Sequence, residues 1–270
     1  MEKTIQVDGL KTRYFEEGSG PAVIFLHGAS LGSSAEVFEK NLPALARGGF
    51  RAIAYDQPGF GLSDNPKDYG ASYRTQFIVK FMDAAGAERA ALIGHSQAGG
   101  MVVRVALQQP GRASHVMIVG SGSVLPPLPG QSGGGGEGQE GSGAPPTLEG
   151  ARKLLENNLF NKSLITPEVL KKRLELSVGK NFEAFLERSK ARAPEKESVP
   201  AWQRLKEIGV PLLLLYGFQD RGSAAKRCAL LKELEPGLRI ELVQNAAHLV
   251  MWEAAEKFNE TLLGFLSREG

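Results

Sequence analysis

The sequence predicts an α/β fold with a mostly parallel central sheet, helices on both faces and an inserted helical lid. Short apolar runs alternate with helix-like stretches along most of the chain, an order typical of parallel sheets. The runs are continuously apolar, as expected for strands that are covered on both faces. One long stretch interrupts this order and contains only helix-like segments. With 270 residues, 42% of them hydrophobic, the chain can bury one large core.

The elements follow one another in a regular order. The first is a hairpin over residues 5–16, with its turn at Asp8 and Gly9. Six apolar runs are predicted to be strands, at residues 22–26, 51–55, 90–93, 115–119, 210–216 and 238–243. Helix-like stretches accompany them at residues 75–85, 99–108, 223–234 and 252–267.

Residues 121–208 break the alternation and are predicted to form the lid segment. Eight of residues 130–143 are glycine, a composition that indicates a mobile loop. Three helix-like stretches follow without an intervening strand, at residues 147–157, 167–177 and 181–192. The expected organisation is therefore a core of residues 1–120 and 209–270, interrupted by a lid at 121–208.

A candidate nucleophile lies where the strand at 90–93 gives way to a helix. There Gly94, His95, Ser96, Gln97 and Ala98 resemble the Gly-x-Ser-x-Gly turn, with alanine at the last position. Small residues allow the tight strand-to-helix turn that exposes a serine hydroxyl at a helix start. The simpler reading of the serine is a helix cap.

Two later residues support the prediction that Ser96 is a nucleophile. Asp220 follows the apolar run at 210–216, and His248 follows the run at 238–243. The carboxyl ends of parallel strands meet at one edge of the sheet, where ligands and catalytic groups gather. Singly, Asp220 could cap a helix and His248 could be a packed histidine. Together the three residues predict a catalytic triad in the chain order serine, acid, histidine.

Acyl transfer also needs donors for an oxyanion. The loop after the strand at 22–26 and the residue after Ser96 are the expected sources, so the backbone N–H groups of Ala29 and Gln97 are the predicted pair. His27 is expected to hold its loop by hydrogen bonds. His95 is expected to face either the substrate pocket or the packing beneath it.

Composition excludes several classes of function. The 32 basic and 30 acidic residues nearly balance, which gives no electrostatic reason for nucleic-acid binding. The single cysteine, Cys228, excludes an internal disulfide, and the scattered histidines give no metal site. No signal peptide or membrane span is indicated. The expectation is a cytoplasmic protein that needs no cofactor and binds a small-molecule substrate, and a homodimer is compatible with the sequence.

Outside the lid, the loop at 25–29, the Tyr-Asp-Gln-Pro-Gly-Phe-Gly sequence at 55–61, the serine turn, Asp220 and His248 together resemble the α/β-hydrolase superfamily. Within it, residues 161–175 and 251–259 resemble the meta-cleavage product hydrolases, which cut carbon–carbon bonds in ring-fission products of aromatic degradation.

The resemblance implies hydrolysis next to the ketone of a 2-hydroxy-6-oxo-dienoate. It also implies that Arg173 in the lid reaches the substrate, where a cation can polarise oxygen. Without the resemblance, residues 171–173 read as a solvated helix face. The expected substrate contacts are Arg173, Gly28, Ser30, His95, Leu249 and Trp252.

The sequence departs from the family at several positions. His95 replaces a frequent asparagine, Leu249 replaces a usual tryptophan, and residues 29–34 replace a glycine-rich loop. These changes leave open a carboxylesterase or lactonase with the same triad. A small-molecule receptor that keeps a slow triad is a further alternative.

Overall fold

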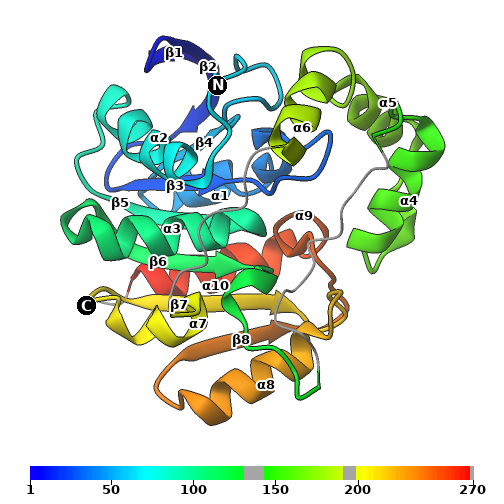
Figure 1. Ribbon diagram of the computed structural model, residues 1–270. Coiled ribbons are helices and arrows are strands. Elements are labelled where there is room, and N and C mark those ends of the chain that lie inside the picture. Colours follow the sequence, from blue (N-terminus) through cyan, green and yellow to red (C-terminus); the bar gives the residue numbers. More distant parts are fainter. Residues whose placement is uncertain (131–142, 191–198, 268–270) are drawn as a thin grey trace.

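An eight-stranded sheet forms the centre of the molecule (Figure 1) in the computed structural model, which describes residues 1–130, 143–190 and 199–267. The strands are β1 (Glu2–Val7), β2 (Leu10–Glu17), β3 (Ala22–Leu26), β4 (Arg51–Tyr55), β5 (Ala90–His95), β6 (Ala113–Val119), β7 (Leu212–Gly217) and β8 (Arg239–Val243). Their order is β1-β2-β4-β3-β5-β6-β7-β8, and only the pairs that include β2 are antiparallel. The predicted mostly parallel sheet is confirmed.

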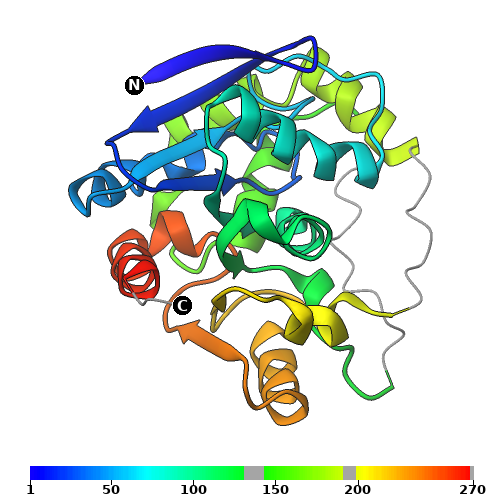
Figure 2. The same cartoon turned by 90° about the vertical axis from the view of Figure 1, so that its left-hand side faces the viewer.

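Helices cover both faces of this sheet, as Figure 2 shows from the side. One face carries α2 (Ala71–Ala84), α3 (Gln97–Gln108) and α8 (Ala224–Leu234), and the other carries α1 (Leu42–Arg47), α9 (Val250–Glu253) and α10 (Ala255–Leu266). Two differences from the sequence prediction stand out. The short α1 was not predicted, and the predicted helix at 252–267 is broken at Ala254, whose φ of −121° and ψ of 44° are not helical.

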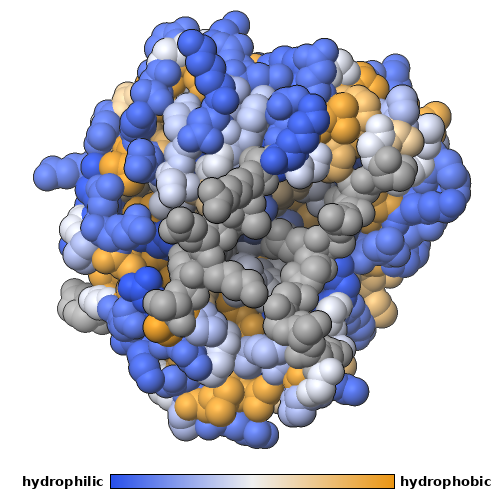
Figure 3. Space-filling model, viewed as in Figure 1, coloured by the Kyte–Doolittle hydropathy of each residue, from blue (hydrophilic) through white to orange (hydrophobic). Residues whose placement is uncertain are grey.

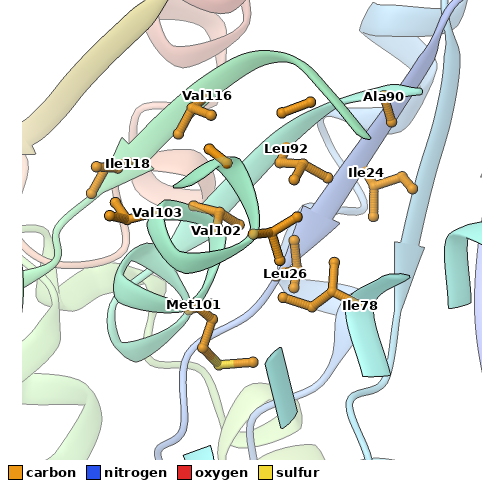
Figure 4. Packing of buried hydrophobic residues seen from close by; sticks show 14 of the residues in the cluster. Ile24, Leu26, Ile78, Ala90, Leu92, Met101, Val102, Val103, Val116 and Ile118 are labelled. Carbon is orange, nitrogen blue, oxygen red and sulfur yellow. The ribbon is translucent and has the colours of Figure 1, made fainter. Parts of the chain in front are cut away.

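Helix α3 lies in the middle of the core and fixes the position of everything at its N-terminus. Val102 packs towards the strand residues Leu26 and Leu92 and the neighbouring Ile78 of α2, and Met101 belongs to the same cluster (Figure 4). All five side chains are at most 3% exposed. Burying side chains of this kind contributes about 1.5–3 kcal/mol each, so the start of α3 is held firmly in place.

The lid segment supplies α4 (Leu148–Asn158), α5 (Pro167–Glu175), α6 (Lys180–Lys190) and α7 (Ala201–Arg204). Thr147 and Thr166 cap α4 and α5 through their hydroxyl oxygens, and Pro167 opens α5. In Figure 1, α4, α5 and α6 lie at the side to which β6 and β7 point, beyond the carboxyl ends of the strands. Most of the predicted glycine-rich loop, residues 131–142, lies outside the described residues, as do residues 191–198 at the end of the third predicted lid helix.

The end of the lid segment belongs to the core packing. Ala201 and Trp202 of α7 pack against the cluster beneath α2, α3 and α8, and Leu205 is only 1% exposed within that cluster. Helix α7 was not predicted and sits beside the sheet, whereas α4 and α5 contribute to the second cluster on the other face.

The surface in Figure 3 is mainly hydrophilic, with small separate hydrophobic areas. The large exposed apolar side chains, such as Leu62, Phe160 and Phe218, are 45–53% exposed and lie far apart in the sequence. Within the described part of the chain, no helix is both long and apolar enough to span a membrane.

Candidate active site

The turn between β5 and α3 forces Ser96 into an unusual backbone conformation. Its φ of 56° and ψ of −126° lie outside the regions that L-residues prefer. The turn closes only because its neighbours are small. A Cβ on Gly94 would lie 2.6 Å from the carbonyl oxygen of Ala98, and a Cβ on Gly99 would lie 2.5 Å from the Cβ of Ser121. The hydroxyl of Ser96 is therefore held at a fixed place by backbone packing.

Ser96, His248 and Asp220 are brought together by three different segments. The Ser96 Oγ lies 3.0 Å from His248 Nε2, and His248 Nδ1 lies 3.1 and 3.2 Å from the two carboxylate oxygens of Asp220. Because a carboxylate only accepts, Nδ1 carries the proton and the Nε2 lone pair faces the serine. All three residues are at most 9% exposed. This arrangement can transfer the serine proton to the imidazole.

Arg221 is a neighbour that sequence reasoning missed. Its backbone N–H donates to Asp220 Oδ1 over 2.7 Å, and its Nη2 lies 3.4 Å from His248 Nε2. A cation thus lies beside the nitrogen that faces Ser96. Its position directly after Asp220 was the only signal in the sequence.

The predicted oxyanion donors lie on two segments that adjoin Ser96. Gln97 is the first residue of α3, so its N–H has no carbonyl one turn earlier in the helix to which it could donate. Ala29 is half-buried in the loop after β3. This loop lies directly against the serine turn, since a Cβ on Gly28 would lie 3.0 Å from the Cβ of Ser96.

His27 holds the loop, as expected. Its Nδ1 donates to the carbonyl oxygen of Gly28 over 2.7 Å, and its Nε2 accepts from the N–H of Gln57 over 3.0 Å. The ring also packs edge-on against Phe60. Complete burial lowers the pKa of His27 to about 4, so the neutral ring keeps both bonds at neutral pH.

His95 lies between the loop that carries His248 and the loop that carries Gly28. Its Nε2 donates to the carbonyl oxygen of His248 over 3.0 Å, so Nδ1 is unprotonated, and a Cβ on Gly28 would lie 3.1 Å from it. Burial, and then the neighbouring His248, hold the pKa of His95 well below its ordinary value. Of the two expected orientations, the ring lines the pocket.

A cavity of about 400 Å³ opens between the lid and the loops that carry Gly28, His95 and His248. Its wall includes every predicted substrate contact: Gly28, Ser30, His95, Arg173, Leu249 and Trp252. Sequence reasoning missed a second group of lining residues: Glu36, Val37, Glu39, Leu155, Asn158, Glu168, Val169, Lys172 and Leu176. Ser96, Ala29 and Gln97 are absent from the wall itself and adjoin it through His248, Gly28 and His95.

Arg173 lies on the inner side of α5. It is half-buried, and a Cβ on Gly32 would lie 3.1 Å from its Cδ and 2.6 Å from its carbonyl oxygen. The side chains of Lys171 and Lys172 are 79% and 54% exposed, and Lys172 pairs with Glu36 over 3.1 Å. The solvated-face reading therefore describes Lys171, whereas Lys172 and Arg173 both line the cavity.

The end of α4 is hydrogen-bonded to the backbone of His248. The carbonyl oxygen of Asn158 accepts from the N–H groups of His248 and Leu249, over 3.0 and 3.2 Å. Asn158 is 2% exposed and also lines the cavity. The lid thus supports the backbone of His248 through two hydrogen bonds.

Glu253 strengthens this connection from the other side. One of its carboxylate oxygens accepts from the N–H groups of Phe160 and Asn161, over 2.8 and 3.1 Å. The other accepts from the N–H of Ala247 over 2.5 Å. A single carboxylate therefore joins the chain after α4 to the residue before His248.

Within the ranges that the structure describes, no three histidine, cysteine or acidic side chains lie close enough together to hold a metal ion. The chemistry that the described geometry can supply is nucleophilic and acid–base, from Ser96, His248 and Asp220.

Comparison with known proteins agrees with this geometry. Residues 21–255 match the family described as "alpha/beta hydrolase fold". The chain is 30% identical over 269 residues to a protein of Burkholderia vietnamiensis (strain G4 / LMG 22486) named 2-hydroxy-6-oxononadienedioate/2-hydroxy-6-oxononatrienedioate hydrolase, covering 96% of this chain and 92% of that one. It is 29% identical to a 2-hydroxy-6-oxo-6-phenylhexa-2,4-dienoate hydrolase of Burkholderia cepacia, over 93% and 90% of the two chains.

Solved structures of hydrolases are also similar in fold to this chain. The meta-cleavage product hydrolase CumD of Pseudomonas fluorescens IP01 superposes with a TM-score of 0.82 at 26% identity, covering 98% of this chain and 97% of that one. Est816, described as an N-acyl homoserine lactone degrading enzyme, has a TM-score of 0.74 at 25% identity, covering 97% and 100%.

Proposed function

The chain belongs to the alpha/beta hydrolase family, and from that premise we propose that it hydrolyses a carbon–carbon bond next to a ketone in a 2-hydroxy-6-oxo-dienoate. The observation that carries the proposal is the hydrogen-bonded series Ser96–His248–Asp220 beside a cavity that also receives the lid cation Arg173. The relatives of this chain that are named as hydrolases of such dienoates support the choice of substrate class.

In the proposed mechanism the dienol substrate first becomes a keto tautomer, as the proton of its 2-hydroxyl is replaced by a proton on carbon 5. His248 then takes the proton of Ser96 as the serine oxygen bonds to the ketone carbon. The N–H groups of Ala29 and Gln97 stabilise the resulting oxyanion. The carbon–carbon bond breaks with its electron pair entering the dienolate, which takes the proton from His248. The neutral His248 then takes a proton from a water that attacks the acyl carbon, and it returns this proton to Ser96 as the acyl group leaves as an acid.

The cavity suits the two ends of such a substrate. Arg173 and Lys172 are cations on the lid side, where a carboxylate or a developing enolate oxygen would be stabilised. Leu155, Val169, Leu176, Leu249 and Trp252 supply apolar surface for the group attached to the ketone. His95 Nδ1 can only accept a hydrogen bond, which suits a hydroxyl of the substrate.

A carboxylesterase or lactonase is the second candidate. Leu249, where the family usually has tryptophan, leaves the wall next to His248 less filled, and the likeness to Est816 fits a lactone substrate. Both reactions use the same three residues, so only the substrate separates them.

The deciding experiment compares dienoate cleavage and nitrophenyl ester hydrolysis in one preparation. We expect the wild-type chain to consume the dienoate, measured by loss of its visible absorbance, and Ser96→Ala to lose about 10³-fold or more on both substrates. Arg173→Gln should lower dienoate cleavage by about 10- to 1000-fold and leave ester hydrolysis within about 5-fold, because a small activated ester needs no cation on its far end.

Lys171→Gln is the matched control, since that exposed lysine precedes Arg173 by two positions and does not line the cavity. A chain that hydrolyses esters and lactones but never the dienoate would contradict the proposal in favour of the second candidate. Equal losses on both substrates in Arg173→Gln would make the arginine structural.

A further inference from the structure

We propose that Arg74 is a positioning residue that holds the two segments of the oxyanion hole in register, acting through Gln57 and Gln97. The inference rests on the proposed function only in that Ser96 forms an oxyanion during acyl transfer. It does not depend on which acyl substrate the chain takes.

Arg74 is placed to contact both segments. It lies in the first turn of α2 and is 8% exposed. Its Nη1 donates to the side-chain Oε1 of Gln97, and its Nη2 lies 3.5 Å from the side-chain Oε1 of Gln57. A planar guanidinium can donate to two acceptors at once in a fixed geometry, which a flexible ammonium cannot do.

Gln57 carries the restraint to the loop after β3. Its side-chain Nε2 donates to the carbonyl oxygen of His27 over 2.5 Å, and its backbone N–H donates to His27 Nε2 over 3.0 Å. Because a carbonyl only accepts, Nε2 must face His27 and Oε1 is left for Arg74. Two residues beyond His27 lies Ala29, one of the proposed oxyanion donors.

Gln97 carries the restraint to the serine turn. Its backbone N–H is the other proposed donor, and its side chain is the one that Arg74 holds. The preceding residue, Ser96, has the strained φ of 56°, so a firm hold on the next residue helps to keep the turn in that conformation. Oxyanion stabilisation depends on donors fixed before the reaction, and small shifts weaken it.

A neighbouring arginine provides a matched control. Burial, and then the nearby charge of Arg74, lower the pKa of Arg188 of α6 to about 9. Arg188 donates to the carbonyl oxygen of Gly59 and stacks on the ring of Phe60. It is thus a half-buried cation of the same region that contacts Gly59 and Phe60 and makes no hydrogen bond to Gln57 or Gln97 in the described part of the chain.

The test measures kcat and KM for a nitrophenyl ester in Arg74→Met, Gln97→Met and the double variant. We expect kcat to fall about 10- to 100-fold in each single variant with KM within about 3-fold, since the contact acts on the transition state. The double variant should lose little more than Arg74→Met alone, because Arg74→Met already removes the contact to Gln97. Arg188→Met should keep wild-type kcat within about 3-fold.

The affinity for a trifluoromethyl ketone distinguishes a positioning role from a merely structural one, because it depends on the oxyanion donors. Ser96 adds to its carbonyl carbon, the serine proton passes to His248, and the hemiketal oxyanion occupies the site of the two N–H donors. Its affinity should fall in parallel with kcat in Arg74→Met and Gln97→Met. Binding of the uncleaved ester, measured in a Ser96→Ala background, should stay unchanged.

The outcomes separate the two proposals. Unchanged ketone affinity in Arg74→Met, or an equal fall in Arg188→Met, overturns the role of Arg74. If Arg74→Met does not fold, the half-buried Gln97→Met decides alone, and a normal kcat in it overturns the inference. If the wild-type chain reacts with neither ester nor ketone at Ser96, the proposed function has failed instead.

Discussion

Protonation of His27 is incompatible with the hydrogen bonds that this residue makes, and this connects its chemistry to the stability of the fold. The neutral ring donates through Nδ1 and accepts through Nε2, whereas a protonated ring could only donate. The folded-state pKa of about 4 is below the ordinary value of 6.5, so between these values the unfolded chain binds the extra proton. The stabilisation is complete above pH 6.5 and is lost as the pH falls towards 4.

We therefore expect the free energy of unfolding to fall by about 3 kcal/mol through His27 alone between pH 6.5 and 4. Urea unfolding at a series of pH values would measure this. In His27→Gln the free energy of unfolding should depend less steeply on pH over the same window, by the equivalent of about one bound proton. His95, whose pKa burial also lowers, remains in both proteins and does not affect the difference. Equal slopes would argue against the assignment.

At the scale of single residues, the sequence predicted those side chains that a local sequence pattern marks. Ser96, Asp220 and His248 each follow an apolar strand, so their meeting at one edge of the sheet could be foreseen. Asn158 and Glu253 could not be found in this way. Their role comes from backbone contacts between segments about ninety residues apart, and nothing in the local pattern encodes such a contact.

Between elements, the connection of α4 to the loop before His248 leads to a second prediction. Glu253→Gln removes one of the two carboxylate oxygens and turns an amide donor towards a backbone N–H. We expect kcat for an ester to fall about 5- to 50-fold, because the His248 backbone loses its support on the lid side. Stability should fall by about 1–2 kcal/mol, as for hydrogen bonds to a half-exposed carboxylate.

The exposed Glu256, on the first turn of α10, is the matched control, and Glu256→Gln should change neither quantity. Steady-state kinetics and urea unfolding on the same samples give both readings. If Glu253→Gln lost stability and kept full kcat, the carboxylate would join the lid to the core without influencing the histidine.

The strands were predicted to within a few residues because most of them, β3 to β7 above all, are short and mainly apolar runs between polar turns. The helices were predicted less completely than the strands. Helix α1 has only six residues and contains Pro43, so it lacks the length over which a helical period can be recognised. The break between α9 and α10 falls at Ala254, and no proline or glycine there predicts it.

For the molecule as a whole, the cavity between lid and core couples ligand binding to folding. A ligand that binds only the folded chain stabilises it by about 2.7 kcal/mol at one hundred times its Kd. For a chain of this size that corresponds to a rise in Tm of about 5–10 °C. We expect Ser96→Ala, which cannot turn the dienoate over, to show this rise in a thermal-unfolding experiment.

The variant carrying both Ser96→Ala and Arg173→Gln should show a smaller rise at the same dienoate concentration, because its Kd is larger. A rise with an ester analogue and none with the dienoate would indicate that the cavity accepts a different acyl substrate from the one proposed.

The two ends of the lid segment touch each other: the turn at Gly122–Val124, just after β6, contacts α7, just before β7. In polymer terms, the lid is a long loop whose base is already closed by contacts that belong to the core. The entropy cost of closing a loop rises only with the logarithm of its length, by about 0.6 kcal/mol for each doubling. Lids of very different length could therefore be exchanged at this base with little effect on the sheet, and the reach of the cavity could change while the reactive groups stay where they are.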